Sequence, residues 1–459
     1  MNIHTIRSIY FIGAGGIGMS ALARYFLSKG IHTGGYDRVP SELTERLAAE
    51  GADIHYTDDE KLIANEFKRP EQTLVVYTPA VPDTHAELRF FRANGFEVLK
   101  RSQVLGLLTE SVRGLCIAGT HGKTTTSAMT AHLLKHSHVD CSAFLGGILK
   151  GYDSNLMLSA TSDLTVIEAD EYDRSFHQLS PCMAVVTSVD PDHLDIYGTP
   201  EAYRESFEIF TSLIRPRGAL IMKSGIDLTP RLQSHVRLYT YSRSDEKADF
   251  HARNIRIGNG EIVFDFVTPS GKIEEIRLGV PVEVNIENGV AAMALACLNG
   301  VRPDEIRNGM QSFEGVLRRF DLRLKTAGIV FIDDYAHHPE EIRNCIRSVR
   351  ALYPGRKITG IFQPHLYSRT RDFAAGFAES LSLLDELILL DIYPAREDPI
   401  PGVTSQIIFD RVTLSQKILC SKEQLPRVIA SGNFEVVLTI GAGDIDRLVE
   451  PIKHMLEQK

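Results

Sequence analysis

The chain has 459 residues, of which 43% are hydrophobic and 24% are charged, a balance typical of soluble globular proteins. At about 150 residues per domain, this length predicts three domains. The formal net charge of -9 argues against nucleic acid as a partner, because non-specific binding to a phosphate backbone needs a basic surface.

Cysteine usage and apolar patterning indicate the compartment. The six cysteines are scattered and form no C-x-x-C pair, which is typical of reduced thiols in a cytosolic protein. The first ten residues contain no apolar signal segment, and no apolar run reaches the roughly 18 residues of a membrane helix. We therefore expect a cytoplasmic protein that does not insert into a membrane.

The first predicted unit is a strand, a glycine-rich turn and a helix between Arg7 and Gly30. The turn matches G-x-G-x-x-G, and an acidic residue follows at the end of the next expected strand. Such a turn places a diphosphate at a helix N-terminus, and both dinucleotides and UDP-sugars carry a diphosphate. The pattern therefore predicts a diphosphate ligand of either kind. The candidate residues are Gly13, Gly15, Gly16, Ile17, Gly18 and Asp37.

The central stretch LCIAGTHGKTTT, residues 115–126, predicts a strand, a phosphate-binding turn and the start of a helix. The common P-loop pattern would need glycine at position 117, so this loop is a shorter variant that carries a histidine. Lys123 can reach the β- and γ-phosphates of a nucleotide, and the Thr124 hydroxyl can hold Mg²⁺. We expect Lys123 to face solvent in the cradle. The predicted ATP-binding residues are Gly119, Thr120, His121, Gly122, Lys123, Thr124 and Thr125.

Two later strands of the same domain end in acidic runs. The run EADEYD contains Glu168 and Glu171, and the run DPDHLD contains His193. An acidic run is more often a solvated loop, but the carboxyl ends of parallel strands face the same crevice as the phosphate loop. We therefore expect Glu168 and His193 to bind metal with Thr124. A later helix starts with Asn285 and Asn288, whose amides could bind adenine or serve only as ordinary helix-start residues.

The third domain contains a complete βαβ unit between Gly328 and Gln363. Polar residues cluster at the carboxyl ends of its strands, where a site lies in an open α/β sheet. The helix begins with Pro339 and two glutamates, as the helix dipole favours. The candidate residues here are Arg319, Asp334, Tyr335, His337, His365 and Arg369.

Seven motifs together resemble the Mur ligases. They are GTHGKTTT, EADE, DPDHLD, an N-x-x-N helix start, RRF, DDYAHHP and FQPH-x-YSRT, in the order and rough spacing of that family. The last two motifs favour the member that acts on UDP-N-acetylmuramate and L-alanine. The resemblance implies an α/β protein of three domains: a Rossmann-like UDP-substrate domain (1–110), a central P-loop-type ATPase with a mostly parallel sheet (111–317) and a Rossmann-like amino-acid domain (318–459).

The resemblance also implies an activity and a set of roles. The activity is an ATP-dependent amide ligation through an acyl phosphate in peptidoglycan precursor synthesis, by a monomer or weak homodimer. Thr124 and Glu168 would hold one Mg²⁺ and His193 a second. The implied nucleotide contacts are Lys123, Asn285, Asn288, Arg319 and Asp334. The implied amino-acid contacts are Tyr335, His337, His365 and Arg369, with His337 the candidate base.

Two positions depart from the family pattern. Val284 stands where the family usually has histidine before the first asparagine, and Leu366 stands where the family commonly has arginine. The second change leaves Arg369 as the main clamp for the amino-acid carboxylate.

Several alternatives stay open at this point. The first glycine turn and Asp37 would also suit an NAD(P)-dependent oxidoreductase, which would leave the GKTTT loop and the acidic runs unexplained. A muropeptide-recycling ligase that adds a peptide, a ligase that adds glutamate to a folate, and a nucleotide-sensing module without catalysis would use similar folds.

Overall fold

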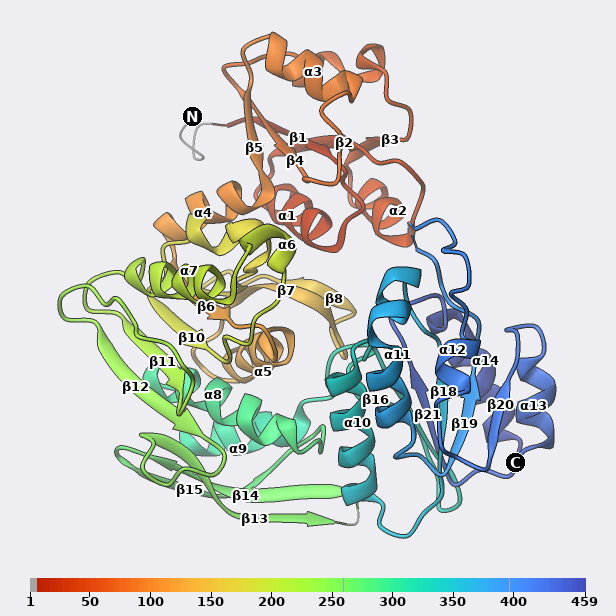
Figure 1. Cartoon of the computed structure of the whole chain (residues 1–459). Helices are drawn as coiled ribbons and strands as arrows, with labels where there is room; N and C mark the ends of the chain where they lie inside the picture. Colours follow the sequence, from red (N-terminus) through yellow and green to blue (C-terminus); the bar gives the residue numbers. More distant parts are fainter. Residues whose placement is uncertain (1–5, 259, 396) are drawn as a thin grey trace. The chain divides into compact units, whose positions relative to one another are not determined.

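The computed structural model describes residues 6–258, 260–395 and 397–459, apart from the side chain of Asp195 (Figure 1). Residues 1–5, half of the segment predicted to lack a signal, lie outside the described residues. The chain divides into two compact units. The first comprises Met1–Arg253, Phe266–Ile273 and Asn288–Ser312, and the second comprises Asn254–Asp265, Glu274–Glu287 and Phe313–Lys459.

The first sheet is five-stranded and entirely parallel, in the order β3-β2-β1-β4-β5. Its strands are β1 (Ser8–Ile12), β2 (His32–Tyr36), β3 (Asp53–His55), β4 (Thr73–Tyr77) and β5 (Glu97–Lys100). In Figure 1, α3 lies on one side of this sheet and α1 and α2 lie on the other. The helices are α1 (Ile17–Ser28), α2 (Glu42–Ala49), α3 (Ala86–Ala93) and α4 (Arg101–Ser111), with 3₁₀ turns η1 (Glu60–Leu62) and η2 (Asn65–Phe67).

Local sequence explains where these elements begin and end. Every residue of β1 is buried, as its continuous apolar run predicts for a central parallel strand. Ser41 caps α2 by accepting a hydrogen bond from the backbone N–H of Thr44, as is typical of a serine directly before a helix.

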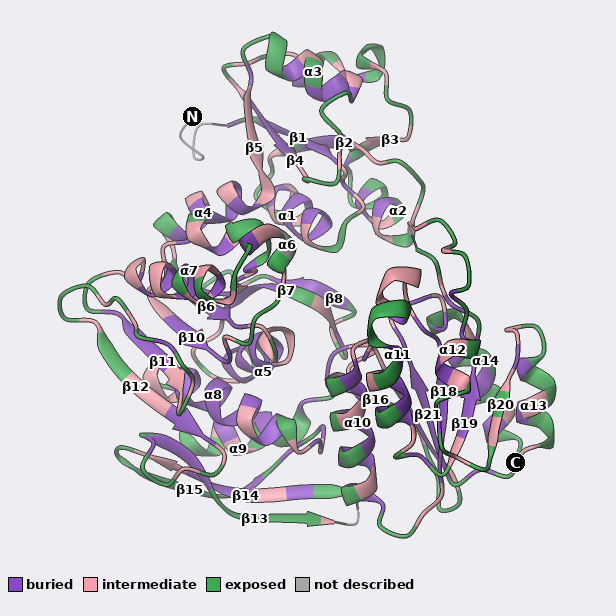
Figure 2. Ribbon diagram, viewed as in Figure 1, coloured by how far each residue is buried: buried purple, intermediate pink, exposed green. Residues whose placement is uncertain are grey.

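The central sheet has ten strands in the order β15-β14-β13-β12-β11-β10-β6-β9-β7-β8. In this order, the seven neighbouring strands β13-β12-β11-β10-β6-β9-β7 are parallel, and β8 at the end is antiparallel to β7. The bounds are β6 (Arg113–Ala118), β7 (Ser142–Leu149), β8 (Ser154–Met157), β9 (Leu164–Glu168), β10 (Met183–Val186), β11 (Ala219–Lys223), β12 (Arg237–Ser242), β13 (Phe250–Gly258), β14 (Glu261–Thr268) and β15 (Gly271–Arg277). Figure 2 shows β6 and β10 almost entirely buried, whereas the start of β12 and much of β13 are exposed.

The predicted strand–turn–helix around the GKTTT loop is confirmed. β6 ends at Ala118, and α5 (Lys123–Lys135) begins after four intervening residues. The other helices of this region are α6 (Leu194–Tyr197), α7 (Pro200–Ser212), α8 (Val284–Leu298) and α9 (Pro303–Ser312), with the 3₁₀ segment η3 (Tyr172–Gln178).

The third sheet has six strands in the order β16-β17-β21-β18-β19-β20, and its neighbours are parallel except β16 against β17. The bounds are β16 (Asp321–Lys325), β17 (Val330–Asp334), β18 (Ile358–Phe362), β19 (Glu386–Leu389), β20 (Lys417–Leu419) and β21 (Val436–Ile440). The helices are α10 (Pro339–Leu352), α11 (Tyr367–Leu381), α12 (Gln406–Phe409), α13 (Leu425–Ser431) and α14 (Asp446–Glu457). Apolar residues of α13 and α14 pack on the sheet in one buried cluster. The predicted βαβ unit is confirmed as β17, α10 and β18.

The α/β class with mostly parallel sheets is therefore confirmed, with one sheet for each expected domain. The predicted boundaries at 110 and 317 stay predictions. Among the described residues, no helix combines the length and apolar character needed to cross a membrane.

Candidate functional site

The first glycine loop joins β1 to α1. The last residue of β2, Tyr36, and the next residue, Asp37, hold this loop by hydrogen bonds. Gly13 has a φ of +89° and donates its N–H to the carbonyl of Tyr36 at 2.8 Å. The N–H of Gly15 donates to Oδ2 of Asp37 at 2.6 Å. The carboxylate predicted to bind ligand therefore supports the loop itself in this structure.

A cavity of about 330 Å³ opens beside this loop. Arg101, the first residue of α4, lines it, and its Nη1 lies 2.8 Å from where a Cβ on Gly18 would stand. A guanidinium at a glycine loop is well suited to a diphosphate. Sequence reasoning missed Arg101, because it stands in an ordinary helix with no motif around it.

The same cavity reaches the central sheet. Besides the loop residues Gly16, Ile17 and Gly18, it is lined by Glu168 and Asp170 at the carboxyl end of β9. Two sites predicted from motifs 150 residues apart therefore open onto one space within the first unit.

The second glycine loop joins β6 to α5. Gly119 and Gly122 have φ values of +139° and +82°, so the turn depends on glycine at both positions. The loop is fixed by two hydroxyl residues after β10: the N–H of His121 donates to Oγ of Ser188, and Oγ1 of Thr187 donates to the carbonyl of His121. Thr187 and Ser188 were missed. The signal was present as two hydroxyl residues directly after a buried strand.

The expectation that Lys123 faces solvent is wrong. Its side chain is 14% exposed, and its Nζ lies 2.7 Å from Oε2 of Glu171, which is 2% exposed. The Lys123 ammonium also donates to the carbonyl of Gly119 at 2.6 Å. Burial raises the pKa of Glu171, and the nearby Lys123 charge opposes that shift. Glu171 and Lys123 thus form a buried pair inside the phosphate loop.

Thr124 and Glu168 lie together, as predicted. Oγ1 of Thr124 donates to Oε1 of Glu168 at 2.8 Å, and the N–H of Gly146 donates to Oε2 at 2.8 Å. A hydroxyl and a carboxylate are hard oxygen donors, which suit Mg²⁺ bound jointly with nucleotide phosphates. Within the described residues, no group of three or more His, Cys, Asp or Glu side chains could hold a metal by itself.

His193, the predicted second metal ligand, has a φ of +51° before α6. Its described side-chain contacts are Asp192, with 3.8 Å between Nε2 and Oδ2, and the ring of Tyr172. These contacts do not bring it to Glu168, and its metal role stays a prediction.

The two predicted adenine contacts are buried. Asn288 is 6% exposed, and its Oδ1 accepts a hydrogen bond from Thr126 while lying 2.6 Å from a Cβ position on Gly122. Asn285 is 5% exposed and donates to the carbonyl of Val280. Asn288 therefore lies against the phosphate loop.

In the second unit, Arg319 and Asp334 lie around the end of β17. The Arg319 guanidinium is 5.4 Å from the ring centre of Tyr335. The Asp334 carboxylate accepts from the backbone N–H groups of Phe320 and Ala336, and burial raises its pKa to about 6. Asp334 thus anchors the turn that carries Arg319.

The predicted amino-acid residues gather beside them. The rings of Tyr335 and His337 are 5.3 Å apart, and those of His337 and His365 are 6.3 Å apart. An Arg369 nitrogen lies 3.3 Å from Nδ1 of His365. The predicted residues of this domain therefore form one cluster at the carboxyl ends of β17 and β18.

His337 is suited to act as a base. Its Nδ1 is 3.0 Å from the carbonyl of Tyr335, so the tautomer with a proton on Nδ1 leaves the lone pair on Nε2 free. Burial lowers the pKa of His337, although the Glu341 charge opposes this shift, so burial favours the neutral ring.

The two departures from the family pattern lie in different settings. Val284 is 50% exposed at the start of α8. Leu366 precedes α11 with a φ of +69°, an uncommon conformation for leucine, and its N–H donates to the carbonyl of Tyr393 at 2.9 Å.

Comparisons with known proteins agree along the whole chain. The Mur ligase family, catalytic domain matches residues 8–113, the Mur ligase middle domain matches 117–296, and the Mur ligase, glutamate ligase domain matches 318–443. The UDP-N-acetylmuramate–L-alanine ligase of Parabacteroides distasonis is 68% identical over 99% of this chain and 98% of its own. The enzyme of the same name from Phocaeicola vulgatus is 63% identical over the full length of both.

Solved structures give the same result. The UDP-N-acetylmuramate-alanine ligase of Thermotoga maritima has a TM-score of 0.81 at 28% identity, covering 98% of this chain and 99% of its own. The murein peptide ligase of Psychrobacter arcticus, at 19% identity and a TM-score of 0.66 over 99% of both chains, shares the fold. With three matching domain models and relatives identical at two thirds of their positions, the chain belongs to the Mur ligase family.

Proposed function

We propose that this chain is an ATP-dependent ligase that joins L-alanine to the carboxylate of UDP-N-acetylmuramate in peptidoglycan precursor synthesis. The observation that carries the proposal is the cavity onto which both the first glycine loop and Glu168 open. A UDP-sugar and a nucleotide γ-phosphate must meet for this reaction, and each glycine loop lies at a helix N-terminus, which suits a phosphate group. Relatives of this name at 57–68% identity support the choice of substrates.

The UDP-substrate would lie along the first loop. The backbone N–H groups of residues 16–18 and the Arg101 guanidinium would bind its diphosphate. Asp37 would keep the loop in shape through the N–H of Gly15. The wall formed by Phe144, Leu145 and Gly146 would then lead the sugar toward Glu168.

ATP would bind at the second loop. The N–H groups at the start of α5 and the Lys123 ammonium would contact its phosphates, and Asn285 and Asn288 would support adenine binding. Thr124 and Glu168 would hold Mg²⁺, with His193 as a ligand of a second ion, and the metal charge would help neutralise the phosphates. From the second unit, Arg319 would stabilise charge on the transferring group and Asp334 would position it.

The reaction has two balanced steps. An oxygen of the substrate carboxylate attacks the γ-phosphorus of ATP, and ADP leaves, giving an acyl phosphate. The amine of L-alanine then attacks the acyl carbon, forming a tetrahedral intermediate that expels phosphate as the amide forms. Nε2 of His337 would accept the amine proton, and Arg369 would bind the L-alanine carboxylate, with Tyr335 and His365 beside it.

We place this enzyme in the cytoplasm. Its partners there would be its two small-molecule substrates, UDP-N-acetylmuramate and L-alanine, and no nucleic acid. Its free cysteines, of which four are buried, suit a reducing compartment. We expect a monomer or a weak homodimer.

Phosphate release in the presence of ATP, Mg²⁺ and UDP-N-acetylmuramate tests the proposal, with each common amino acid added in turn. Release that needs both UDP-N-acetylmuramate and L-alanine supports it. Release with a peptide instead would indicate the recycling activity. No release with any acceptor, together with a change in NAD(P)H fluorescence on binding, would overturn the proposal in favour of an oxidoreductase.

A further inference from the structure

A second cavity lies at the amino ends of strands in the central sheet, whereas the phosphate loop lies at the carboxyl end of β6. It has a volume of about 740 Å³ and is lined at the amino ends of β10, β11 and β12 by Met183, Ala219 and Arg237. These three residues are aligned partners across the strands, so their side chains project from the same face. The phosphate loop follows the carboxyl end of β6, so the two sites use opposite ends of the sheet.

Three basic side chains line this cavity, those of Arg217, His235 and Arg237. None of the nine lining residues is acidic. Within the described residues, none of the three side chains has an ion pair or a hydrogen bond, whereas Arg204 and Arg231 of the same unit are paired with carboxylates. The chain has 59 acidic and 50 basic residues, so acidic partners outnumber basic side chains. A group of basic side chains without acidic partners therefore stands out, and it attracts anions.

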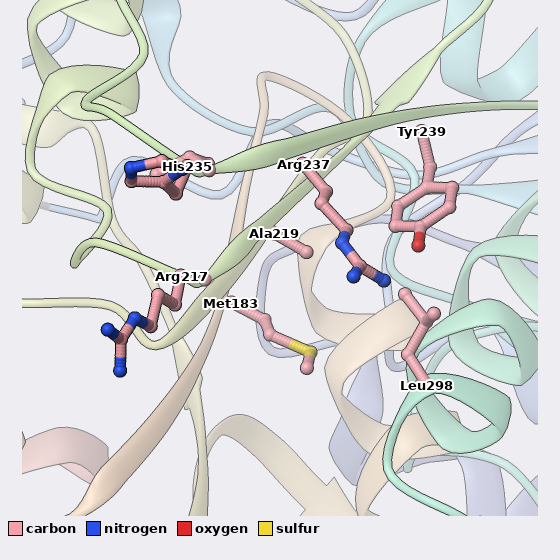
Figure 3. A pocket seen from close by; sticks show the side chains of 9 residues that line it. Met183, Arg217, Ala219, His235, Arg237, Tyr239 and Leu298 are labelled. Carbon is pink, nitrogen blue, oxygen red and sulfur yellow. The ribbon is translucent and has the colours of Figure 1, made fainter.

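The remaining lining supplies an aromatic and apolar surface. Tyr239 lies two residues after Arg237 and therefore on the same face of β12. Figure 3 shows the Arg237 guanidinium, the Tyr239 hydroxyl, Met183 and Leu298 turned toward the same space, with Arg217 and His235 to one side. The Tyr239 ring is held by an edge contact with Phe250, whose centre is 5.6 Å away.

The rim of the cavity is shaped by two unusual turns. Arg217 and His235 precede β11 and β12 with φ values of +68° and +63°. The backbone N–H of Arg237 donates to the carbonyl of Gly218 at 3.0 Å, which ties the turn before β11 to the start of β12. Non-glycine residues with positive φ persist where surrounding structure enforces them, and they often mark binding sites.

We propose that this cavity is a second binding site, separate from the ligase centre, for a small organic phosphate with a flat or apolar body. Arg237 and the Tyr239 hydroxyl bind the phosphate, and Met183, Leu298 and the Tyr239 ring contact the body. Arg217 adds positive charge at the entrance, and the His235 ring adds a hydrogen-bonding group there. The inference does not depend on the ligase activity, because no lining residue belongs to the catalytic cluster.

Calorimetric titration of the full chain with phenyl phosphate tests this inference. A non-hydrolysable ATP analogue, Mg²⁺ and UDP-N-acetylmuramate are kept saturating, so that the ligase centre is occupied. We expect one phenyl phosphate per chain, with much weaker binding of phenol and of inorganic phosphate. Arg237→Ala should weaken phenyl phosphate binding by about tenfold or more, since a charge-assisted contact is lost.

Two controls separate the site from a general charge effect. Arg231→Ala removes an exposed arginine of the same unit that is paired with Glu205 and Glu208, and it should leave binding unchanged. Tyr239→Ala should weaken binding, while ligase turnover stays normal in both cavity variants. All three residues lie at the surface or half-buried, so the variants should fold.

The inference is overturned by any of four results. These are no binding of phenyl phosphate, binding that the catalytic ligands displace, equal binding by Arg237→Ala, and inorganic phosphate binding as tightly as phenyl phosphate. Sedimentation supplies a further decisive result: a dimer that Arg237→Glu dissociates would make this cavity a contact between copies of the chain instead.

Discussion

The two glycine loops of the first unit share a backbone design and differ in how they are held. Each joins a buried parallel strand to a helix, and each contains a glycine with positive φ. The first loop is supported by a carboxylate, Asp37, on the N–H of Gly15. The second is supported by the neutral hydroxyls of Thr187 and Ser188.

Their cations differ as well. Arg101 reaches the first loop from the start of α4 and faces the cavity, whereas Lys123 belongs to the second loop and is paired with Glu171. The difference teaches that a glycine pattern determines where a phosphate can bind, while contacts distant in sequence determine how much charge meets it.

The strongest way to test this contrast is Lys123→Ala. Turnover should fall by about 10³-fold, because the variant loses a charge aimed at the transferring phosphoryl group. The free energy of unfolding should also fall, by about 1–3 kcal/mol, because Glu171 is left buried without its partner. Phosphate release and denaturant unfolding measure the two effects.

Lys123→Ala combined with Glu171→Gln is the matched control. It should recover stability without recovering turnover. Near-normal turnover in Lys123→Ala would remove Lys123 from the ATP site.

Arg101→Ala should act on the first loop only. The KM for UDP-N-acetylmuramate should rise by about 10- to 100-fold, with the KM for ATP unchanged, because a charged hydrogen bond to the diphosphate is lost. Arg92→Ala, which removes an arginine paired with Asp83, serves as the control and should change neither value. A rise confined to the KM for ATP would show that Arg101 serves the second loop instead of the first.

Helix α3, which packs on the first sheet, contains a buried acid, Glu87, and within the described residues no lysine pairs with it. It is fully buried, accepts a hydrogen bond from Tyr10 at 2.9 Å and lies 3.1 Å from Nε2 of His55. Burial raises the pKa of Glu87 from 4.5 to about 8. Between these values the folded chain holds a proton that the unfolded chain has released, so stability falls as pH rises, by at most about 1.4 kcal/mol per pH unit.

Glu87→Gln should therefore flatten the decline in unfolding free energy between pH 5 and pH 8, measured by urea titration at each pH. Glu71→Gln changes an exposed glutamate just before β4 of the same sheet and should keep the decline. An unchanged slope in Glu87→Gln would mean that Glu87 is charged in the folded chain.

The smallest effect is expected for Asp37→Asn. The amide oxygen of asparagine can still accept from Gly15, so the KM for UDP-N-acetylmuramate should change by less than about threefold. A much larger rise, measured in the same assay, would make Asp37 a direct ligand contact and would reduce the difference between the loops.

Elements and motifs were predictable because they are local. The apolar run before Gly119, the cap at Ser41 and the Pro339 helix start each follow from neighbouring residues. Thr124 and Glu168 could be paired in advance because both lie at carboxyl ends of strands in one parallel sheet. The partner of Lys123 could not, since the acidic run from the last residue of β9 onward offers four carboxylates and only folding selects Glu171. Arg101 could not either, because nothing in its helix distinguishes it from a surface arginine.

The backbone at Leu366 has a consequence for how this chain can vary. A φ of +69° with a ψ of 138° is about as costly for arginine as for leucine, at about 1–3 kcal/mol, so exchange between them leaves the strain of this turn unchanged. Glycine would relieve that strain and would loosen the segment between His365 and Arg369. Position 366 can therefore exchange side chains without changing the strain of its backbone, whereas glycine would change it.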